Sequence, residues 1–223
     1  SIDYIVTKIP RFSFEKFSTT SGLLTTSMQS VGEAMSFGTS FSESLQKGLC
    51  SLETGLTGLN QPKKNKNNSL YDIEENLLIQ SPERILYVAE ALRKKFSIKK
   101  ISILTGYDIW FINQINEIIK IEKKILNKKF LFKIENFYKL KNIGFSDKRI
   151  SEISGISIKK INEYKFKNHI KPLYKRVDTC AGEFNSATPY LYSSYNNNYS
   201  FKDACEANPT IRKKIIILGG GPN

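Results

Sequence analysis

Apolar residues recur every three or four positions through the middle of the chain, and this spacing predicts a series of short helices. Thr39 is the expected N-cap of a first helix that Gly55 closes, and Ser81 with Pro82 behind it is expected to begin a second. The apolar faces of these two helices comprise Phe41, Leu45, Leu49 and Leu52 in the first and Ile85, Val88, Ala89 and Leu92 in the second.

Further helices follow at intervals set by serine or aspartate caps and closing glycines. The long helix after Asp108 has a stripe that includes Ile112, Ile115, Ile118, Ile119, Glu122 and Ile125. The expected helices run from Ser97 to Gly106, from Asp108 through this stripe, over 130–142 towards Gly144, from Ser146 to Gly155, and from Ser157 to about His169.

The flanks of this helical middle have a different pattern. Residues 2–9 and 213–218 are β-branched runs that predict strands, and 171–177 and 188–195 predict extended chain. Residues 10–34 are rich in turn formers, and 60–69 predict a polar linker. Because the last run enters Gly219-Gly220-Gly221 with no helix behind it, we expect both ends to be cuts through larger α/β units.

Composition excludes several classes of protein. At 223 residues and 40% hydrophobic, the chain can bury one sizeable core, and its apolar runs are too short to cross a bilayer. Cys50, Cys180 and Cys205 are odd in number and widely spaced, which fits a reducing cytoplasm better than a disulfide framework. We expect neither a secretory leader nor a membrane partner.

Positive charge is concentrated in the middle of the chain. Residues 84–176 hold 23 Lys and Arg against 8 Asp and Glu, a net +15 within a total of +13. A nucleic-acid binder has this pattern, and so does a solvated lysine-rich surface that accompanies high Asn and Ile. We favour the solvated surface and keep nucleic-acid binding as the alternative.

A short internal repeat bears on the possibility of nucleic-acid binding. Residues 96–106 match 145–155 at six of eleven positions, and each copy predicts a cap, a short helix, a glycine turn and a second helix. The pattern resembles a helix-turn-helix, but the helix after Gly106 offers Trp110 and Phe111, which supply one hydrogen-bond donor to a base. The second copy presents Lys159, Lys160 and Asn162, which suit contacts with phosphates. Helical hairpins that bury Phe96, Ile101, Phe145 and Ile150 are the expected use.

The search for catalytic groups returns no constellation. His169 is the only histidine, Cys180 has no nearby base, and a glycine run without a complete phosphate-binding motif is a weak signal. The acids Asp72, Glu74 and Glu75 suit the start of a helix, where they complement its dipole. The sequence therefore assigns no catalytic, cofactor-binding or metal-binding residue.

Seven motifs in order resemble one family, the large subunit of carbamoyl-phosphate synthetase. Their sequence positions span nearly the whole chain, and as an ordered set they are far more specific than any one alone. They are Asp3–Phe12 (DYIVTKIPRF), Met28–Met35 (MQSVGEAM), Glu43–Lys47 (ESLQK), Tyr174–Ala181 (YKRVDTCA), Tyr190–Tyr195 (YLYSSY), Cys205–Pro209 (CEANP) and Ile217–Asn223 (ILGGGPN).

The resemblance implies a mainly α fold: a helical oligomerisation domain flanked by short α/β pieces of two ATP-grasp synthetic units. Residues 1–34 are then the tail of the first unit, 35–185 the oligomerisation domain, and 186–223 a linker with the first strand and glycine turn of the second. The family's catalytic and metal-binding residues lie outside this span, so the fragment is expected to be inactive and to bind no cofactor.

The resemblance also implies the activity of the parent protein. Such enzymes make carbamoyl phosphate from bicarbonate, ammonia and two ATP, with Mg²⁺ and K⁺, in the cytoplasm. A glutaminase subunit or fused domain supplies the ammonia, and the helical domain self-associates. Two positions depart from the family: Gln29 stands where the family usually has Lys, and Thr39 stands where it often has Arg. The segment 196–203 is longer and richer in Asn than is typical of the family.

Overall fold

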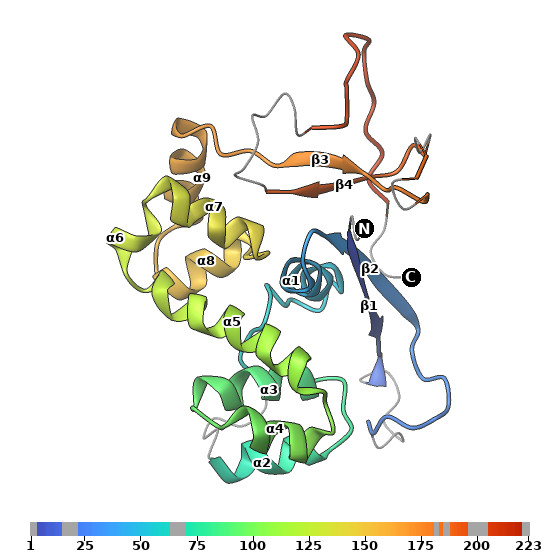
Figure 1. The fold of residues 1–223 in the computed structure, drawn as a ribbon, viewed down its shortest axis with the longest axis vertical. Coiled ribbons are helices and arrows are strands. Elements are labelled where there is room, and N and C mark those ends of the chain that lie inside the picture. The colour runs from blue at the N-terminus through green and yellow to red at the C-terminus, as the bar shows by residue number, and fades with distance from the viewer. Residues whose placement is uncertain are drawn as a thin grey trace. The chain divides into compact units, whose positions relative to one another are not determined.

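The computed structural model describes residues 4–14, 22–62, 70–180, 183–184, 188–195 and 205–219. Helices dominate these residues and two small two-stranded sheets accompany them, which confirms the predicted mainly α fold (Figure 1). In chain order the elements are β1 (Ile5–Arg11), β2 (Gly32–Gly38), α1 (Phe41–Ser51), α2 (Leu70–Leu78), α3 (Arg84–Arg93), α4 (Ile98–Thr105), α5 (Ile109–Ile125), α6 (Lys128–Leu131), α7 (Ile134–Asn142), α8 (Asp147–Ser154), α9 (Ile158–Lys167), β3 (Leu173–Arg176) and β4 (Leu191–Ser194).

The chain divides into two compact units with separate cores. Unit 1 comprises residues 1–9, 34–58 and 124–222, and unit 2 comprises residues 10–33, 59–123 and 223. The fully buried side chains of unit 1 include Leu45, Leu131, Phe137, Leu140, Phe145, Ile150 and Ile161, and those of unit 2 include Ile73, Leu77, Val88, Ile101, Ile112, Ile115 and Ile118. At roughly 2 kcal/mol for each buried aliphatic or aromatic side chain, these residues are the main source of stability in each unit.

In unit 1, α1 packs closely on strand residues (Figure 1). A Cβ on Gly48 would lie 2.8 Å from Cδ1 of Ile9 and 2.9 Å from the hydroxyl of Ser36, so a larger residue there would have to displace these two side chains. The helix begins one residue later than predicted. Ser40 is its N-cap and accepts a hydrogen bond from the amide of Glu43 at 3.2 Å, whereas Thr39 binds the Glu43 carboxylate.

Strand β2 falls partly in the predicted turn-rich segment and was missed. Its buried face is made of Ala34, Ser36 and Gly38, and Met35 on the opposite face is exposed. Because the buried positions carry small or polar residues, hydrophobicity does not distinguish the buried face of this strand from the exposed one.

The two echoed segments form the same hairpin, once in each unit. We call residues 96–112 the first hairpin and residues 145–161 the second. Ser97 and Ser146 cap the first helix of each hairpin, and Gly106 and Gly155 end it in the left-handed conformation at φ 72° and 68°. These caps confirm the prediction.

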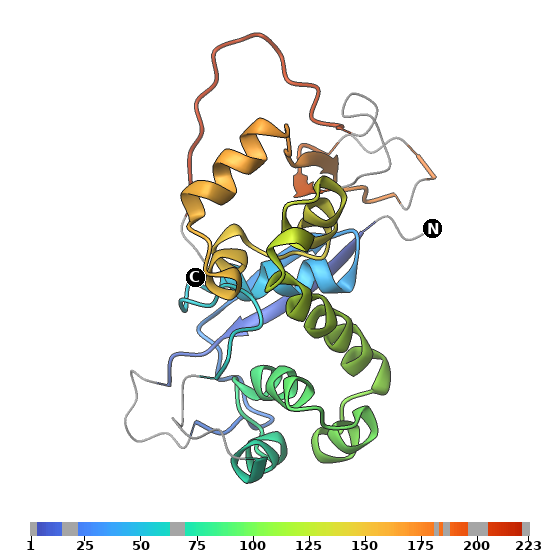
Figure 2. The ribbon, with the colours of Figure 1, turned by 90° about the vertical axis from the view of Figure 1, so that its left-hand side faces the viewer.

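Hydrogen bonds inside the glycine turns repeat as well. The hydroxyl of Ser102 donates to the carbonyl of Tyr107 at 2.8 Å, and that of Ser151 donates to the carbonyl of Ile156 at 2.6 Å. Ile101, Phe145 and Ile150 are buried as predicted, while Phe96 is half-buried. Figure 2 shows α8 and α9, the helices of the second hairpin, side by side.

Two other predicted helices differ from the structure. Ser81 is not an N-cap: its carbonyl accepts from the amide of Arg84 in a turn, and α3 begins three residues later, after Glu83. The predicted helix over 130–142 is two helices. Asn127 caps α6, and the backbone leaves the helical conformation at Phe132 and Lys133 before α7 begins. The helix after Asp108 and the helix after Ser157 are confirmed.

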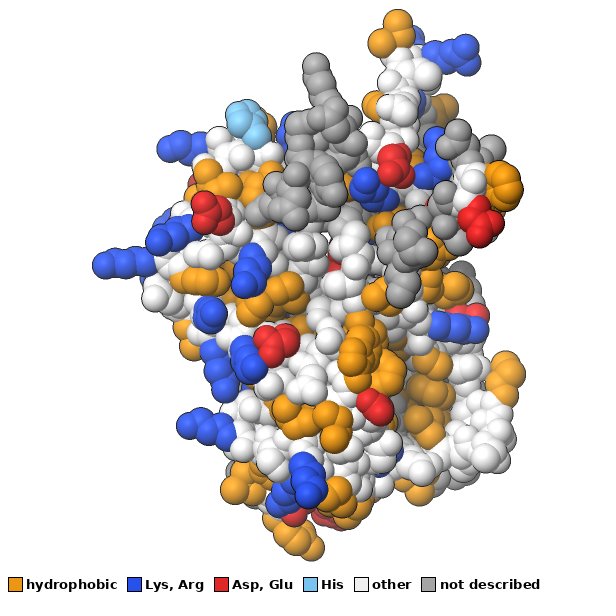
Figure 3. Space-filling model, viewed as in Figure 1, with side chains coloured by type: hydrophobic (Ala, Val, Ile, Leu, Met, Phe, Trp, Pro, Cys, Tyr) orange, Lys and Arg blue, Asp and Glu red, His pale blue; other side chains and the backbone are white. Residues whose placement is uncertain are grey.

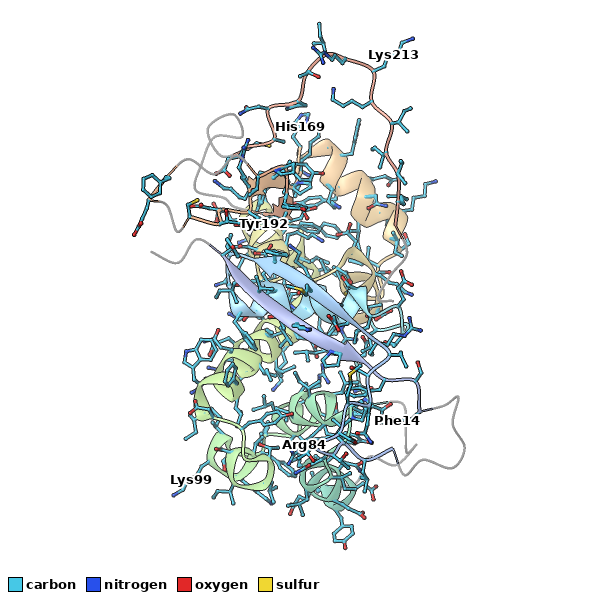
Figure 4. The ribbon with its side chains drawn as sticks, turned by 90° about the vertical axis from the view of Figure 1, so that its right-hand side faces the viewer. Phe14, Arg84, Lys99, His169, Tyr192 and Lys213 are labelled. Atoms are coloured by element: carbon cyan, nitrogen blue, oxygen red, sulfur yellow. The ribbon has the colours of Figure 1, made fainter. Side chains whose placement is uncertain are left out.

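The C-terminal part of unit 1 is extended. β3 and β4 pair antiparallel with Leu173 opposite Ser194, which confirms two predicted extended segments. The predicted strand at 213–218 is wrong in this structure, since those residues form no regular element and Ile215, Ile216, Ile217 and Leu218 are exposed (Figure 4, near Lys213). A strand needs a neighbouring strand to pair its backbone amides and carbonyls, and in the described ranges no strand pairs with residues 213–218.

Candidate functional site

Residues from two of the sequence motifs meet around the carboxylate of Glu43 in unit 1. The Glu43 side chain is 2% exposed and its Oε2 accepts from the amide of Thr39 at 2.7 Å and from the Thr39 hydroxyl at 2.9 Å. The hydroxyl of Ser194, 151 residues away, donates to the same oxygen at 3.1 Å. We call Thr39, Glu43, Lys47 and Ser194 the Glu43 cluster.

Lys47 links this cluster to two strands. Its ammonium lies 3.7 Å from Oε1 of Glu43 and donates to the carbonyls of Phe37 at 2.5 Å and Ser193 at 2.6 Å. Burial lowers the pKa of Lys47, and the nearby Glu43 carboxylate partly offsets that effect. The ring of Tyr192, labelled in Figure 4, lies 5.9 Å below the ammonium. The ammonium therefore joins the end of β2 to β4 through α1.

A second, partly buried ion cluster connects α7, α8 and α9. Asp147 at the start of α8 binds Lys141 at 2.8 Å through one oxygen and Lys165 at 2.5 Å through the other. Lys141 also donates to the carbonyl of Phe145 at 2.8 Å, and its ammonium lies 5.1 Å from the ring centre of Tyr195. We call Lys141, Asp147 and Lys165 the Asp147 cluster.

Two ammonium groups share one carboxylate in the Asp147 cluster. Burial alone would raise the pKa of Asp147, but the charge and hydrogen bonds of the two lysines outweigh burial and hold the pKa below 3.8. Burial lowers the pKa of Lys141, because the Asp147 carboxylate, which Lys165 also binds, only partly replaces the hydration that the Lys141 ammonium loses. Burial also raises the pKa of Tyr195 to about 12.

Unit 2 has a corresponding cluster around Arg93, at the end of α3. Its guanidinium binds both oxygens of Glu122 on α5, at 2.7 and 2.9 Å, and contacts Glu90 at 3.2 Å. It also donates to the carbonyl of Leu59. This fork geometry is specific to arginine, and it fixes α3, α5 and the chain at Leu59 to one another.

The residues weighed as chemical candidates lie apart from one another. His169 follows α9 with a positive φ of 54° (Figure 4), and Cys180 lies in a bend where its amide is bound by Asp178. Asp72 lies in the first turn of α2, as expected for an acid near a helix N-terminus. In the part of the chain that the structure describes, no three His, Cys, Asp or Glu side chains group as metal ligands.

The two departures from the family pattern have local partners. Gln29 accepts a hydrogen bond from the amide of Thr25 at 3.1 Å, and Thr39 belongs to the Glu43 cluster. Residues 63–69 of the predicted linker, residues 196–203 and Gly220 and Gly221 lie outside the described residues.

The surface combines lysines with apolar patches. On the face drawn in Figure 3, blue cationic side chains are interspersed with orange apolar ones. Trp110 and Phe111 are exposed at the start of α5, and Lys159 and Lys160 are exposed at the start of α9. Among the described helices, none combines the length and the apolar character that crossing a bilayer requires.

Ion clusters fasten helices and strands to one another within each unit. Residues 33–169, well over half of the chain, match the family described as carbamoyl-phosphate synthetase large chain, oligomerisation domain. The chain belongs to this family.

Curated proteins that are similar to this chain along its whole length carry the name of the same enzyme. Proteins called carbamoyl phosphate synthase large chain are 46% identical in Pseudomonas aeruginosa, 44% in Neisseria meningitidis serogroup B and 45% in Buchnera aphidicola. Each alignment covers 100% of this chain and 20% of the relative. The chain therefore spans about one fifth of the length of the proteins it matches.

Proposed function

We propose that this chain is the scaffold and self-association region of the large subunit of a carbamoyl-phosphate synthetase. The observation that carries the proposal is identity of 44–46% along the full chain to proteins of that name. The Glu43 cluster supports it, because residues from separate family-like motifs are bound to one another there. A scaffold role agrees with polar side chains that bind one another across elements far apart in the sequence.

The parent protein, on this proposal, is a ligase that uses two ATP to convert bicarbonate and ammonia into carbamoyl phosphate for arginine and pyrimidine biosynthesis. Glutamine hydrolysed by a glutaminase subunit or fused domain supplies the ammonia. ATP, Mg²⁺ and K⁺ act in synthetic units whose reactive residues lie outside this chain, in the cytoplasm. The division into residues 1–34, 35–185 and 186–223 belongs to the same proposal.

Among the described residues, no three His, Cys, Asp or Glu side chains form a ligand set for Mg²⁺. The carboxylates of Glu43, Asp147 and Glu122 are bound by lysine, arginine or hydroxyl donors, and a metal ion would have to displace these partners. We therefore derive no step of phosphoryl transfer within this chain.

Carbamoyl-phosphate formation tests the proposal. The full-length parent with its glutaminase should form carbamoyl phosphate from bicarbonate, glutamine and ATP, and the 223-residue chain alone should not. Turnover by the isolated chain, or a parent without this activity, would refute the assignment.

The competing nucleic-acid function requires a separate measurement. Fluorescence anisotropy with duplex DNA should show weak binding that disappears by physiological salt, as expected for nonspecific contact with phosphates. Submicromolar binding that persists at that salt would favour the competing function.

A further inference from the structure

The strand β3 has one edge paired with β4 and one edge that no strand of the described ranges covers (Figure 1). In an antiparallel pair, the backbone groups of alternate residues face the partner strand, and those of the residues between them face away. The amide of Val177 donates to the carbonyl of Tyr190 across the sheet at 2.9 Å, so the backbone groups of Tyr174 and Arg176 face away from β4. The open edge therefore presents a carbonyl at Tyr174 and an amide at Arg176.

Glu206, from the motif at 205–209, binds both of these groups. Its amide donates to the carbonyl of Tyr174 at 2.7 Å, and one oxygen of its carboxylate accepts from the amide of Arg176 at 2.6 Å. The other carboxylate oxygen lies 3.1 Å from the ammonium of Lys175. A parallel neighbouring strand would bind the same two backbone groups through the amide and the carbonyl of one residue. Here the carboxylate takes the place of that carbonyl, so a single residue closes the edge.

The residues after Glu206 do not suit further pairing with β3. Asn208 has a positive φ of 38°, which is not an extended conformation, and Pro209 has no amide to donate. Residues 213–218 form no regular element and the side chains of residues 215–218 are exposed, so burial does not hold them in place. The bonds at Glu206 are thus the point at which the segment 205–219 is joined to β3.

The opposite edge of the same sheet is also bound by a side chain. Ser193 lies opposite Tyr174, so its carbonyl points away from β3, and that carbonyl accepts from the ammonium of Lys47 at 2.6 Å. Lys47 belongs to α1. A continuous set of hydrogen bonds therefore runs from α1 through β4 and β3 to Glu206.

We propose that Glu206 is a positioning residue, which anchors the segment 205–219 to β3 and so fixes where the second synthetic unit begins relative to α1. The inference rests on the proposed function, in which residues 186–223 lead into that unit. Without the Glu206 carboxylate, β3 keeps its pairing with β4, and β4 keeps its bond to Lys47. Loss of the anchor should therefore disturb the second unit and leave the first in place.

Hydrogen–deuterium exchange of the full-length parent tests the anchor. Glu206→Ala removes the carboxylate and should speed exchange of the Arg176 amide about tenfold, since the lost acceptor is charged. Lys175→Met keeps that hydrogen bond and removes only a partly exposed ion pair, so the exchange rate should stay within about twofold. Glu183→Ala is the matched control, because it removes the same charged group from an exposed position of unit 1 and should leave the Arg176 amide unchanged.

The two phosphorylations of the parent test the positioning. Bicarbonate-dependent hydrolysis of ATP measures the first unit. Formation of ATP from ADP and carbamoyl phosphate, with release of carbamate, reverses the reaction of the second unit and measures it. Glu206→Ala should lower the second rate about tenfold and leave the first unchanged. Glu206→Gln retains an oxygen that accepts from the amide of Arg176 and should restore most of the second rate.

The other outcomes each overturn part of this inference. Unchanged exchange at Arg176 in Glu206→Ala refutes the anchor. Faster exchange with both rates unchanged shows an anchor that positions nothing, and two rates that fall together show a general loss of structure instead of positioning. An unsubstituted parent that carries out neither reaction refutes the proposed function and the positioning role with it, whereas the exchange measurement still decides whether Glu206 holds the segment to β3.

Discussion

Removal of the Glu43 carboxylate is the most informative perturbation of unit 1. Glu43→Ala deletes the acceptor of three hydrogen bonds and the carboxylate that pairs with the half-buried Lys47. Breaking a buried ion pair by removing one partner costs about 3–5 kcal/mol. Lys47 is partly exposed and keeps two carbonyl acceptors, so we expect the lower end, about 3 kcal/mol.

Urea unfolding, followed by circular dichroism, measures this loss. With a urea dependence of about 2 kcal/mol per molar, a loss of about 3 kcal/mol moves the midpoint of unit 1 down by about 1.5 M. Glu43→Gln is the control, because its amide oxygen still accepts from Thr39 while the charge is gone. We expect it to cost about 1–2 kcal/mol. A Glu43→Ala midpoint within about 0.3 M of the unchanged chain would show that the cluster contributes little.

Three further predictions follow from the other clusters and from the glycine turns. Asp147→Asn should lower the free energy of unfolding by about 2 kcal/mol at pH 7. Because the folded pKa of Asp147 lies below 3.8, its stabilisation is present above that pH and is lost as pH falls through the folded pKa; a difference from wild type in urea unfolding that does not shrink below about pH 3 would contradict this account. Gly144→Ala should cost more than Gly155→Ala, which should cost about 1 kcal/mol through its positive φ alone, since only at Gly144 would the new Cβ meet backbone, 2.9 Å from a carbonyl oxygen; equal thermal midpoints would contradict it. Arg93→Lys should destabilise unit 2 by about 2 kcal/mol because lysine cannot reproduce the two-pronged bond to a carboxylate, and a loss below about 0.5 kcal/mol in urea unfolding would show that charge alone suffices.

The local signals in the sequence predicted the helix ends well where side chains form the caps. Ser97, Ser146 and Ser157 bind the backbone amides expected of them, because capping involves residues only three positions apart. Ser81 failed because the turn after it delays the helix, and the choice between a turn and a helix start depends on packing rather than on the serine.

The features that depend on distant residues were not predictable from local patterns. Ser194 reaches Glu43 across 151 positions, and Arg93 reaches Glu122 across 29, and no periodicity encodes such pairs. The β2 strand was missed because its buried face carries small residues, so hydrophobicity does not distinguish that face from the exposed one. The family resemblance depends on the order of the motifs in the sequence. The contacts between residues of different motifs are visible only in the folded chain.

The repeated hairpin provides two copies of one amide hydrogen bond in different surroundings. The amide of Ile101 donates to the carbonyl of Ser97 at 3.0 Å, and that of Ile150 donates to the carbonyl of Ser146 at 2.9 Å. Because the first helix starts from a serine cap in both hairpins, any difference between the deuterium exchange rates of these two amides reflects chiefly how firmly each unit holds its hairpin closed. A single molecule thereby carries its own internal standard for comparing the opening of its two halves.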